Sequence, residues 1–207
     1  SLSHSEVNQG YDMVKDPSLY YKVKLADEEK FLIVWTTMPF TLVTDAMVGV
    51  NPKEEYVEII VNDETWIVGK TRLEEFMSEV KIEDYHMQKT FLGSEMEGKK
   101  YIHPLLDEIP KLAEIAKQDN YHVTVAEDFV DVNAGSGLVH LSPANGEEDH
   151  NIATKRKVTI FSPKKTSGTP TVAASAIWSN LNKISSISSG EMLMPPLIIR
   201  SFFLPVK

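Results

Sequence analysis

The chain has 207 residues, of which 42% are hydrophobic and 25% are charged, and its formal net charge is −9. This composition is typical of a globular protein with one domain, or one domain and an appendage, rather than a disordered chain. The acidic balance argues against a protein that coats nucleic acid, because such binding needs clustered Lys and Arg. The absence of cysteine excludes disulfides, thiolate metal sites and a cysteine nucleophile, and is compatible with a reducing cytoplasm.

No segment has the pattern of a membrane span or of a leader peptide. Residues 1–10 are too polar for the apolar core of a signal peptide. The longest apolar stretch, residues 192–206, is shorter than a membrane-spanning helix and is interrupted by three prolines and by Arg200. We therefore expect a cytoplasmic protein with no membrane partner.

Six short segments have the apolar content and the flanking turn residues of β-strands. They are residues 20–25, 31–35, 56–61, 65–68, 121–125 and 137–141. The first alternates apolar and polar side chains, and the second is a continuous apolar run suited to a buried strand. Turn-forming residues at 62–64 (NDE) predict a hairpin between the third and the fourth segment, and Asn51-Pro52 predicts another turn.

Two segments have the spacing of amphipathic helices. Residues 72–80 form one, and residues 110–118 form the other, with Leu112, Ile115 and Ala116 on a shared face. Pro110 suits the first turn of the second helix. Many short strands with a few helices predict a β-barrel-like α+β domain.

Residues 145–149 (NGEED) have the features of a helix start. We expect the Asn145 side chain to cap the free amide groups of the first helical turn, and Glu148, three residues later, to reach back toward it. Acidic residues in the first turn and Lys155-Arg156-Lys157 in the last complement the helix dipole, and we interpret the basic end as solvated rather than as a phosphate contact. The alternative to this purely helical role is that Asp149 projects into a cleft and binds a cation.

Other residues that could carry chemistry are scattered. The histidines lack the spacings of zinc sites, and neither a phosphate- or dinucleotide-binding fingerprint nor a nucleophile elbow is present. We therefore expect no metal and no cofactor. Because His140 lies in an otherwise apolar strand, we expect its side chain to be buried in the core and hydrogen-bonded. Thr36 and Thr37 lie where a buried strand ends, before Pro39, and we expect their side chains to hydrogen-bond to nearby backbone groups.

The balance of charge changes near the C-terminus. From Lys164 onward the chain has five basic residues and one acidic residue, Glu191, so the acidic excess lies before this point. The segment is also rich in serine, as in residues 185–190 (SSISSG). Such a break in composition indicates a boundary, which we place near 163–168.

Three segments before that boundary carry long motifs in a fixed order. Residues 5–11 (SEVNQGY) lead into 15–18 (KDPS), residues 31–42 (FLIVWTTMPFTL) are rich in threonine, and residues 135–143 (GSGLVHLSP) continue into GEED. In sequence and separation they resemble the editing (CP1) insertion of isoleucyl-tRNA synthetases, which are class I enzymes. The likeness covers about residues 3–163 and implies an editing domain at 1–163, followed by an unmatched C-terminal segment at 164–207.

The resemblance implies an activity and its partners. In this family the synthetic site cannot fully reject valine, which is one methylene smaller than isoleucine, and a second, smaller pocket hydrolyses the error. The chain would therefore be an aminoacyl-tRNA deacylase that cleaves Val-tRNA(Ile) as part of an isoleucine-tRNA ligase. Its partners would be tRNA(Ile) mischarged with valine and the rest of the synthetase chain. The adenylate-forming signatures of class I enzymes are absent, so we do not expect amino-acid activation in this chain.

The resemblance also assigns roles to single residues. Asp149 would hold the α-ammonium group of the substrate, and Thr36 and Thr37 would orient the ester and the attacking water. His140 would line the wall that selects by size. The remaining substrate-binding positions are Met38 and Phe40. No covalent nucleophile or metal is required, because an activated ester needs mainly positioning.

The chain departs from the isoleucyl pattern at four positions of these motifs. The family normally has threonine at Met38, tryptophan at Phe40, alanine at Ser142 and often histidine at Asn145. Valyl and leucyl insertions usually carry arginine at the position of Met38 and no histidine at that of His140, so the isoleucyl branch fits better. Two alternatives to a deacylase stay open, namely a module that binds charged tRNA without hydrolysing it and a purely structural insertion.

Overall fold

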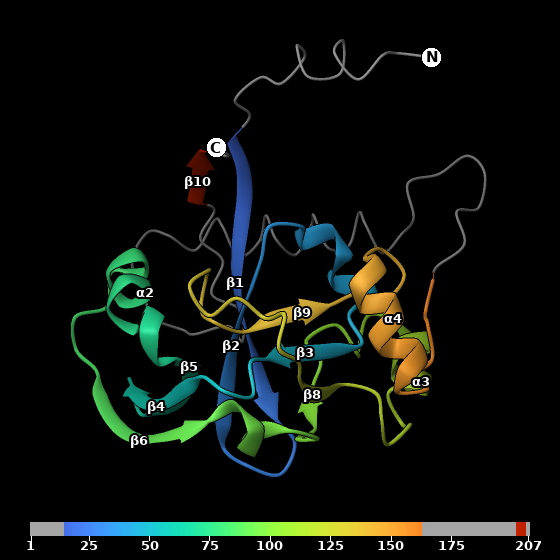
Figure 1. Ribbon diagram of the computed structural model, residues 1–207, viewed down its shortest axis with the longest axis horizontal. Helices are drawn as coiled ribbons and strands as arrows, with labels where there is room; N and C mark the ends of the chain where they lie inside the picture. Colours follow the sequence, from blue (N-terminus) through green and yellow to red (C-terminus); the bar gives the residue numbers. More distant parts are fainter. Residues whose placement is uncertain (1–14, 163–201, 206–207) are drawn as a thin grey trace.

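A computed structural model of the protein describes residues 15–162 and 202–205 (Figure 1). The expected boundary at 163–168, most of the segment that follows it and residues 5–11 of the first motif lie outside the described residues. Over the described part, a single mixed sheet of ten strands forms the body of the molecule, and three α-helices lie around it. None of the helices in this part is long and apolar enough to cross a membrane.

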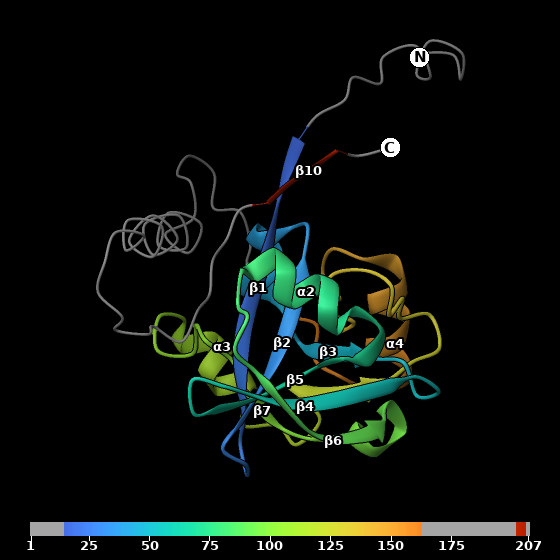
Figure 2. The same ribbon diagram turned by 90° about the vertical axis from the view of Figure 1, so that its left-hand side faces the viewer.

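The sheet runs in the order β6-β4-β5-β2-β9-β3-β8, and β1 pairs with β2, β7 and β10. It curls on itself as an open barrel (Figures 1 and 2), which confirms the expected barrel-like α+β class. The strands are β1 Lys15–Leu25, β2 Lys30–Thr36, β3 Met47–Val50, β4 Glu55–Val61, β5 Glu64–Gly69, β6 His86–Leu92, β7 Tyr101–Ile102, β8 Val123–Ala126, β9 Val139–Leu141 and β10 Phe202–Pro205.

Helices connect these strands and cover the sheet. The α-helices are α2 Leu73–Val80, α3 Pro110–Ile115 and α4 Glu147–Lys155, and the short 3-10 helices are η1 Pro39–Thr44, η2 Lys70–Arg72 and η3 Gly93–Met96. One apolar cluster fills the inside of the curl, a second lies between α2 and the sheet, and a third lies between the sheet and helices α3 and α4. The expected proline in the first turn of the helix at 110 is confirmed.

The predicted hairpin is confirmed with a tighter turn. Strands β4 and β5 pair antiparallel, and Asn62 and Asp63 alone form the turn, with φ of 46° and 66°. Positive φ at both turn residues matches the twist of the flanking strands, and Asn and Asp tolerate it better than most residues. Glu64 therefore begins β5 instead of belonging to the turn.

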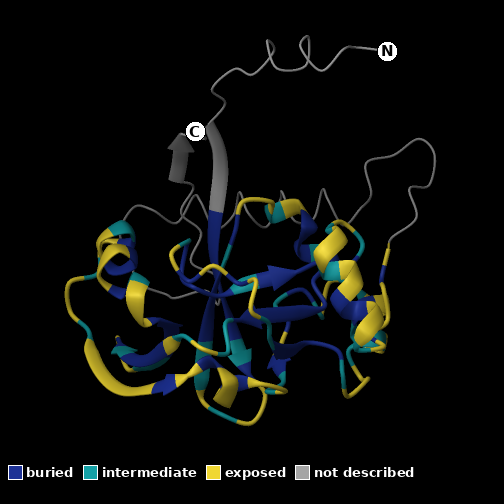
Figure 3. Ribbon diagram, in the orientation of Figure 1, coloured by how far each residue is buried: buried dark blue, intermediate teal, exposed yellow. Residues whose placement is uncertain are grey.

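From Leu19 to Leu25, strand β1 is buried on both faces (Figure 3), although its sequence alternates apolar and polar side chains. Its odd-numbered side chains from Leu19 to Leu25 join the inner cluster. On the other face, the Tyr20 ring packs against Phe76 of α2 with 5.1 Å between centroids. The buried Lys22 on that face pairs with Glu64 at 2.7 Å. A polar residue in an alternating strand can thus face another element instead of solvent.

Two predicted strands and one predicted helix are shorter than expected. Residues His122 and Gly137 have φ of 51° and 79°, so the extended backbone begins only after them, at Val123 and Val139. Helix α3 ends at Ile115, and the next residues continue with tighter bonds such as Lys117 N–H to Glu114 O. The ends of these strands and of this helix are set by backbone geometry, which the apolar content of the sequence does not reveal.

Candidate functional site

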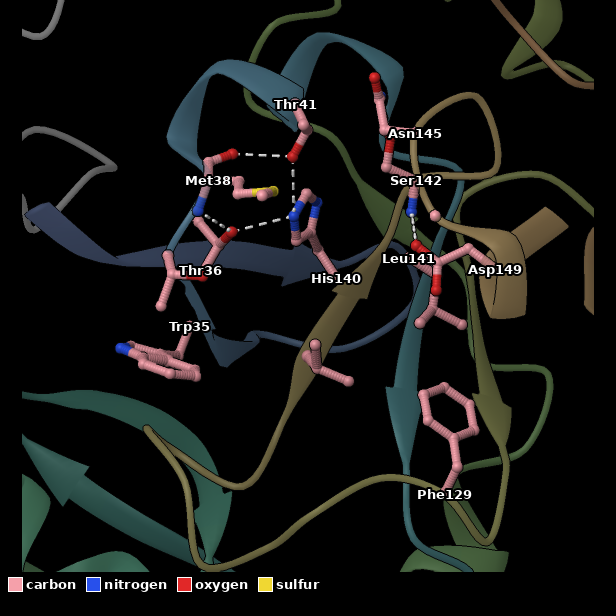
Figure 4. Close-up of a pocket in the computed structure, with 13 residues that line it drawn as sticks. Trp35, Thr36, Met38, Thr41, Phe129, His140, Leu141, Ser142, Asn145 and Asp149 are labelled. Atoms are coloured by element: carbon pink, nitrogen blue, oxygen red, sulfur yellow. Dashed lines mark hydrogen bonds between the residues drawn. The ribbon is translucent and has the colours of Figure 1, made fainter. Parts of the chain in front are cut away.

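A pocket of about 220 Å³ lies where β2 and β9 end and α4 begins (Figure 4). The two strands are parallel neighbours paired through Trp35 and Val139, so the residues that follow them emerge at the same edge of the sheet. The pocket is lined by residues 35–38 at the end of β2 and just after it, by Thr41, by residues 139–142, by Phe129, and by Asn145, Gly146 and Asp149 at the start of α4. Every site residue expected from the sequence lines this pocket except Phe40.

His140 is the centre of the hydrogen-bond network in this pocket. Its side chain is buried, and its Nε2 lies 3.0 Å from Thr36 Oγ1 and 3.1 Å from Thr41 Oγ1. Its Nδ1 faces inward, 3.8 Å from Oδ1 of Asp45. Burial lowers the pKa of His140 to about 4, so the ring is neutral at neutral pH. The expected buried, hydrogen-bonded histidine therefore also forms part of a pocket wall.

The residues after β2 differ in how far they reach solvent. Thr36 is buried, and its Oγ1 accepts a hydrogen bond of 3.0 Å from the amide of Met38, which confirms its local backbone role. The side chain of Thr37 is exposed and has no hydrogen-bond partner among residues 15–162. Met38 is 54% exposed. Thr36 is therefore part of the pocket floor, whereas Thr37 and Met38 form its rim.

Asp149 sits half-buried on the opposite side of the pocket. Its Oδ2 accepts a hydrogen bond of 2.7 Å from the amide of Ser142, the residue that follows β9. Burial raises the pKa of Asp149, the Ser142 amide opposes this effect, and the nearby Glu148 adds to it. The helix thus carries a carboxylate whose second oxygen, Oδ1, is left for another donor.

The predicted capping box at the start of α4 is wrong. The helix is capped by Gly146 without a side-chain hydrogen bond. The amide of Asn145 instead donates to the hydroxyls of Thr44 and Ser142, both at 2.7 Å. Because Thr44 lies 101 residues away in the chain, this contact of the Asn145 side-chain amide could not be read from the local pattern. The acidic first turn of the helix is confirmed.

The basic end of α4 is not simply solvated. Arg156 donates to Glu97 at 2.5 Å and to Glu127 at 2.8 Å, so it joins the helix end to two distant segments. The interpretation of the helix end as solvated is therefore corrected for Arg156, which is bound by two carboxylates.

Phe40 lies outside the pocket, with 59% of its surface exposed.

Sequence reasoning missed several residues that build the pocket. Thr41 is brought back beneath Met38 by the 3-10 helix η1, whose Pro39 start was visible in the sequence. Phe129 and the buried Asp45 come from a loop and a helix end that carry no motif. Within residues 15–162, no group of three or more His, Asp and Glu side chains has an arrangement that could hold a metal ion.

The chain is 40% identical to the isoleucine–tRNA ligase of Methanocaldococcus jannaschii over 172 residues, which cover 79% of this chain and 17% of that protein. It is 35% identical to the isoleucine–tRNA ligase of Pyrococcus horikoshii over 169 residues, which cover 79% of this chain and 16% of that protein. The chain belongs to the isoleucine–tRNA ligase family. It spans only a small part of the length of the ligases it matches, and no family model matches it.

The fold of this chain is also found in solved editing domains. The editing domain of the Plasmodium knowlesi cytosolic leucyl-tRNA synthetase matches with a TM-score of 0.54 at 14% identity, covering 87% of this chain and 80% of that one. That of P. falciparum matches with a TM-score of 0.51 at 11% identity, covering 69% and 67%. This part of the isoleucine–tRNA ligase family therefore has the editing-domain fold.

Proposed function

We propose that this chain is the editing domain of an isoleucine–tRNA ligase and hydrolyses the ester of Val-tRNA(Ile). The observation that carries the proposal is the meeting of Thr36, Thr37, His140 and Asp149 around one small pocket. Thr36 and His140 are 104 positions apart in the chain and lie 3.0 Å apart in space. A pocket of about 220 Å³ is smaller than those of ~300–1,000 Å³ that bind drug-sized ligands, which suits an aminoacyl group.

Asp149 would bind the α-ammonium group of the substrate. One of its oxygens is held by the Ser142 amide at 2.7 Å, so the carboxylate has a fixed orientation and a second oxygen to offer. A hydrogen bond between charged partners contributes about 1.5–3 kcal/mol. Bound ammonium would also favour the ionised carboxylate and so offset the effect of burial on its pKa.

The hydroxyls on the other side of the pocket would position the ester and the water. The exposed Thr37 hydroxyl can contact a water molecule, whereas the buried Thr36 hydroxyl faces the same pocket from its floor. An aminoacyl ester is already activated, so holding it and a water molecule in reacting geometry supplies most of the required catalysis. Neither a covalent nucleophile nor a metal has a step in this proposal.

His140 and Met38 would set the size limit on the amino-acid side chain. The His140 ring is held on one edge by two hydroxyls, which makes it a rigid wall. The tRNA itself would be bound mainly by the rest of the synthetase, because a chain with a net charge of −9 attracts the phosphate backbone poorly. The tRNA(Ile) mischarged with valine would therefore be a partner of the whole ligase.

The deciding experiment is single-turnover deacylation of Val-tRNA(Ile) by the full chain, with protein in large excess so that weak tRNA binding is overcome. We expect hydrolysis by the wild type and a loss of about 10- to 100-fold in Asp149→Asn, the factor that corresponds to one charge-assisted hydrogen bond. The matched control is Glu147→Gln, which removes an exposed carboxylate from the same helix turn and should leave the rate unchanged.

The other outcomes separate the alternatives. Binding of Val-tRNA(Ile) without hydrolysis would support a binding module. Normal hydrolysis by Asp149→Asn together with a lower melting temperature would assign Asp149 to the structure only, through its bond to Ser142. Absence of both binding and hydrolysis in the wild type would contradict the proposed function.

A further inference from the structure

A carboxyl group lies beneath the pocket without a lysine or arginine partner in the described residues. Asp45, at the end of η1, has 0% of its surface exposed. Its Oδ2 accepts a hydrogen bond of 2.9 Å from the Tyr101 hydroxyl. The nearest nitrogens of ionisable groups are those of His103 at 3.6 Å and His140 at 3.8 Å. A buried carboxylate with no cation beside it is costly.

His103 does not supply that cation. Its Nδ1 accepts a hydrogen bond from the amide of Leu105 at 3.2 Å, so this nitrogen carries no hydrogen. Its Nε2 lies 3.1 Å from the carbonyl oxygen of Leu42 and donates to it. The ring is therefore neutral. The ring of His122, whose Nε2 lies 3.2 Å from the Asp45 carbonyl oxygen, is buried as well, and burial lowers its pKa to about 4.

The hydrogen bonds on the pocket side of His140 decide which of its nitrogens carries the hydrogen. The Thr41 hydroxyl donates to the carbonyl oxygen of Met38 at 2.7 Å. A hydroxyl has one hydrogen, and we assign it to the shorter contact, with Met38, so that Thr41 Oγ1 accepts from His140 Nε2, 3.1 Å away. The hydrogen therefore sits on Nε2, and Nδ1 of the neutral ring is bare.

The bare Nδ1 and the Oδ1 of Asp45 are each buried without a hydrogen-bond partner among the described residues. They face each other at 3.8 Å, and a small side-chain rotation would bring them within hydrogen-bond distance. Catalytic hydrogen bonds that are long in an unliganded site often shorten in this way when a ligand binds. The bare Nδ1 needs a hydrogen-bond donor, and Oδ1 of Asp45 becomes a donor when it takes up a proton. A single proton shared by the two atoms satisfies both, and when it sits on Oδ1 neither buried side chain carries a charge, which costs less in this buried site than an ion pair.

We propose that Asp45 is a positioning residue: its protonated Oδ1 donates to Nδ1 of His140 and holds the ring as the Nε2–H tautomer. Thr36 Oγ1 then accepts from both His140 Nε2 and the Met38 amide, so its own hydrogen is left for the pocket. Thr36 would accordingly donate a hydrogen bond to a substrate oxygen and would not act as a base. Burial raises the pKa of Asp45 well above its ordinary value, although the Tyr101 hydroxyl works against this.

The test is nitrogen NMR of the histidine rings in the full chain, with the His140 signals identified by their loss in His140→Phe. We expect the Nε2–H tautomer in the wild type. Asp45→Asn should preserve it, because the amide nitrogen also donates to Nδ1 while the amide oxygen still accepts from Tyr101. Asp45→Ala should move the Nδ1 signal to the position of an unbonded nitrogen. His103, whose tautomer is set by two backbone groups, is the internal control.

An Nδ1–H tautomer in the wild type would overturn the proposal, since Asp45 would then be the acceptor. Inversion of the tautomer in Asp45→Asn would overturn it as well, and so would an unchanged Nδ1 signal in a folded Asp45→Ala variant. If Asp45→Ala does not fold, the wild type and Asp45→Asn still decide. The role of Thr36 toward a substrate rests on the proposed function, but the tautomer does not.

Deacylation provides a second readout. Asp45→Asn should keep most of the activity and Asp45→Ala should lose about 10- to 100-fold, which matches the cost of leaving a buried polar group without its hydrogen-bond partner. A chain with the Nε2–H tautomer and no deacylase activity would contradict the proposed function alone. Loss of activity in Asp45→Asn with an unchanged tautomer would contradict the positioning role alone.

Discussion

The ring of His140 and the hydroxyls of Thr36 and Thr41 form one hydrogen-bonded unit at the floor of the pocket. The same unit holds the turn after β2, because both hydroxyls also bond to the backbone of Met38. A change in any of these side chains therefore affects both the shape of the pocket and the position of its rim. Size and hydrogen bonding must be separated by choosing variants that alter one of the two.

His140→Ala changes the size of the pocket. Removal of the ring should let a longer side chain enter, so the variant should begin to cleave Ile-tRNA(Ile) while still cleaving Val-tRNA(Ile). The ratio of the two deacylation rates should rise by at least about 4-fold, which corresponds to the ~0.8 kcal/mol of burying one methylene. Thr41→Val, which keeps the volume of the side chain and removes the hydroxyl, is the control and should not raise the ratio. Equal losses in both rates would mean that His140 does not select by size.

Gly146→Ala tests how Asp149 is held. Gly146 has φ of −105°, which alanine adopts readily, but its new Cβ would lie 2.8 Å from Asp149 Oδ2. The carboxylate would have to turn away from the Ser142 amide. We expect deacylation to fall as far as in Asp149→Asn, and the double variant should be no worse than either single one, because both act on one contact. Independent, additive losses would show that Gly146 acts elsewhere.

At the scale of elements, the loop before β9 joins the two halves of the site. The Gly69 amide donates to the Ser136 carbonyl oxygen at 2.7 Å, and the Trp35 amide to the Leu138 carbonyl oxygen at 3.1 Å. The loop therefore binds β5 and β2 before β9 presents His140. At Gly137, φ is +79° and an added Cβ would lie 2.9 Å from the Gly69 Cα, so glycine is required there both for the backbone and for the close approach.

Gly137→Ala and Gly98→Ala form a matched pair. Gly98 has φ of +78° and no atom within 4 Å of an added Cβ, so its substitution should cost only the left-handed backbone penalty of about 1–2 kcal/mol. Gly137→Ala should cost clearly more in the free energy of unfolding by urea, because the backbone of β5 blocks the new atom. It should also reduce deacylation by moving β9. Equal costs for the two variants would show that the contact with Gly69 does not constrain the loop.

At the scale of the whole molecule, buried ionisable groups make the stability depend on pH. Burial lowers the pKa of His103 well below its ordinary value, and those of His122 and His140 to about 4. The unfolded chain binds protons at these residues from about pH 6.5, whereas the native chain does not until the pH is much lower. Stability is therefore lost as the pH falls from about 6.5 to 4. Asp45, whose pKa is raised, has the opposite sign.

The three histidines take up protons on unfolding between about pH 6.5 and 4, whereas Asp45 and Asp149, whose pKa values are raised, release them. The histidines outnumber the aspartates, so the free energy of unfolding should fall as the pH falls through this range, as measured by urea unfolding at several pH values. His122→Gln should reduce the slope by up to about 1.4 kcal/mol per pH unit, the contribution of one proton. His86→Gln, at a histidine whose side chain is 80% exposed, is the control and should leave the slope unchanged.

Local patterns were sufficient for features that depend on neighbours in the chain. The NDE turn predicted the hairpin of β4 and β5, the apolar run 31–35 predicted a buried β2, and Pro110 predicted the first turn of α3. The long motifs indicated the segments that line the pocket. Each of these features depends on backbone propensity or on residues within a few positions of one another, which the order of amino acids expresses directly.

The contacts inside the site were decided by the tertiary structure alone. Asn145 has the sequence of a helix cap, yet it bonds to Thr44 because the curl of the sheet places that hydroxyl beside it. Asp45 has no motif, and only the packing of β7 and β9 around it brings Tyr101 and His140 to its two oxygens. The sequence by itself indicated which segments line the pocket. The partner of each polar group was determined by folding, because a buried donor or acceptor must pair with whatever the fold brings within about 3 Å.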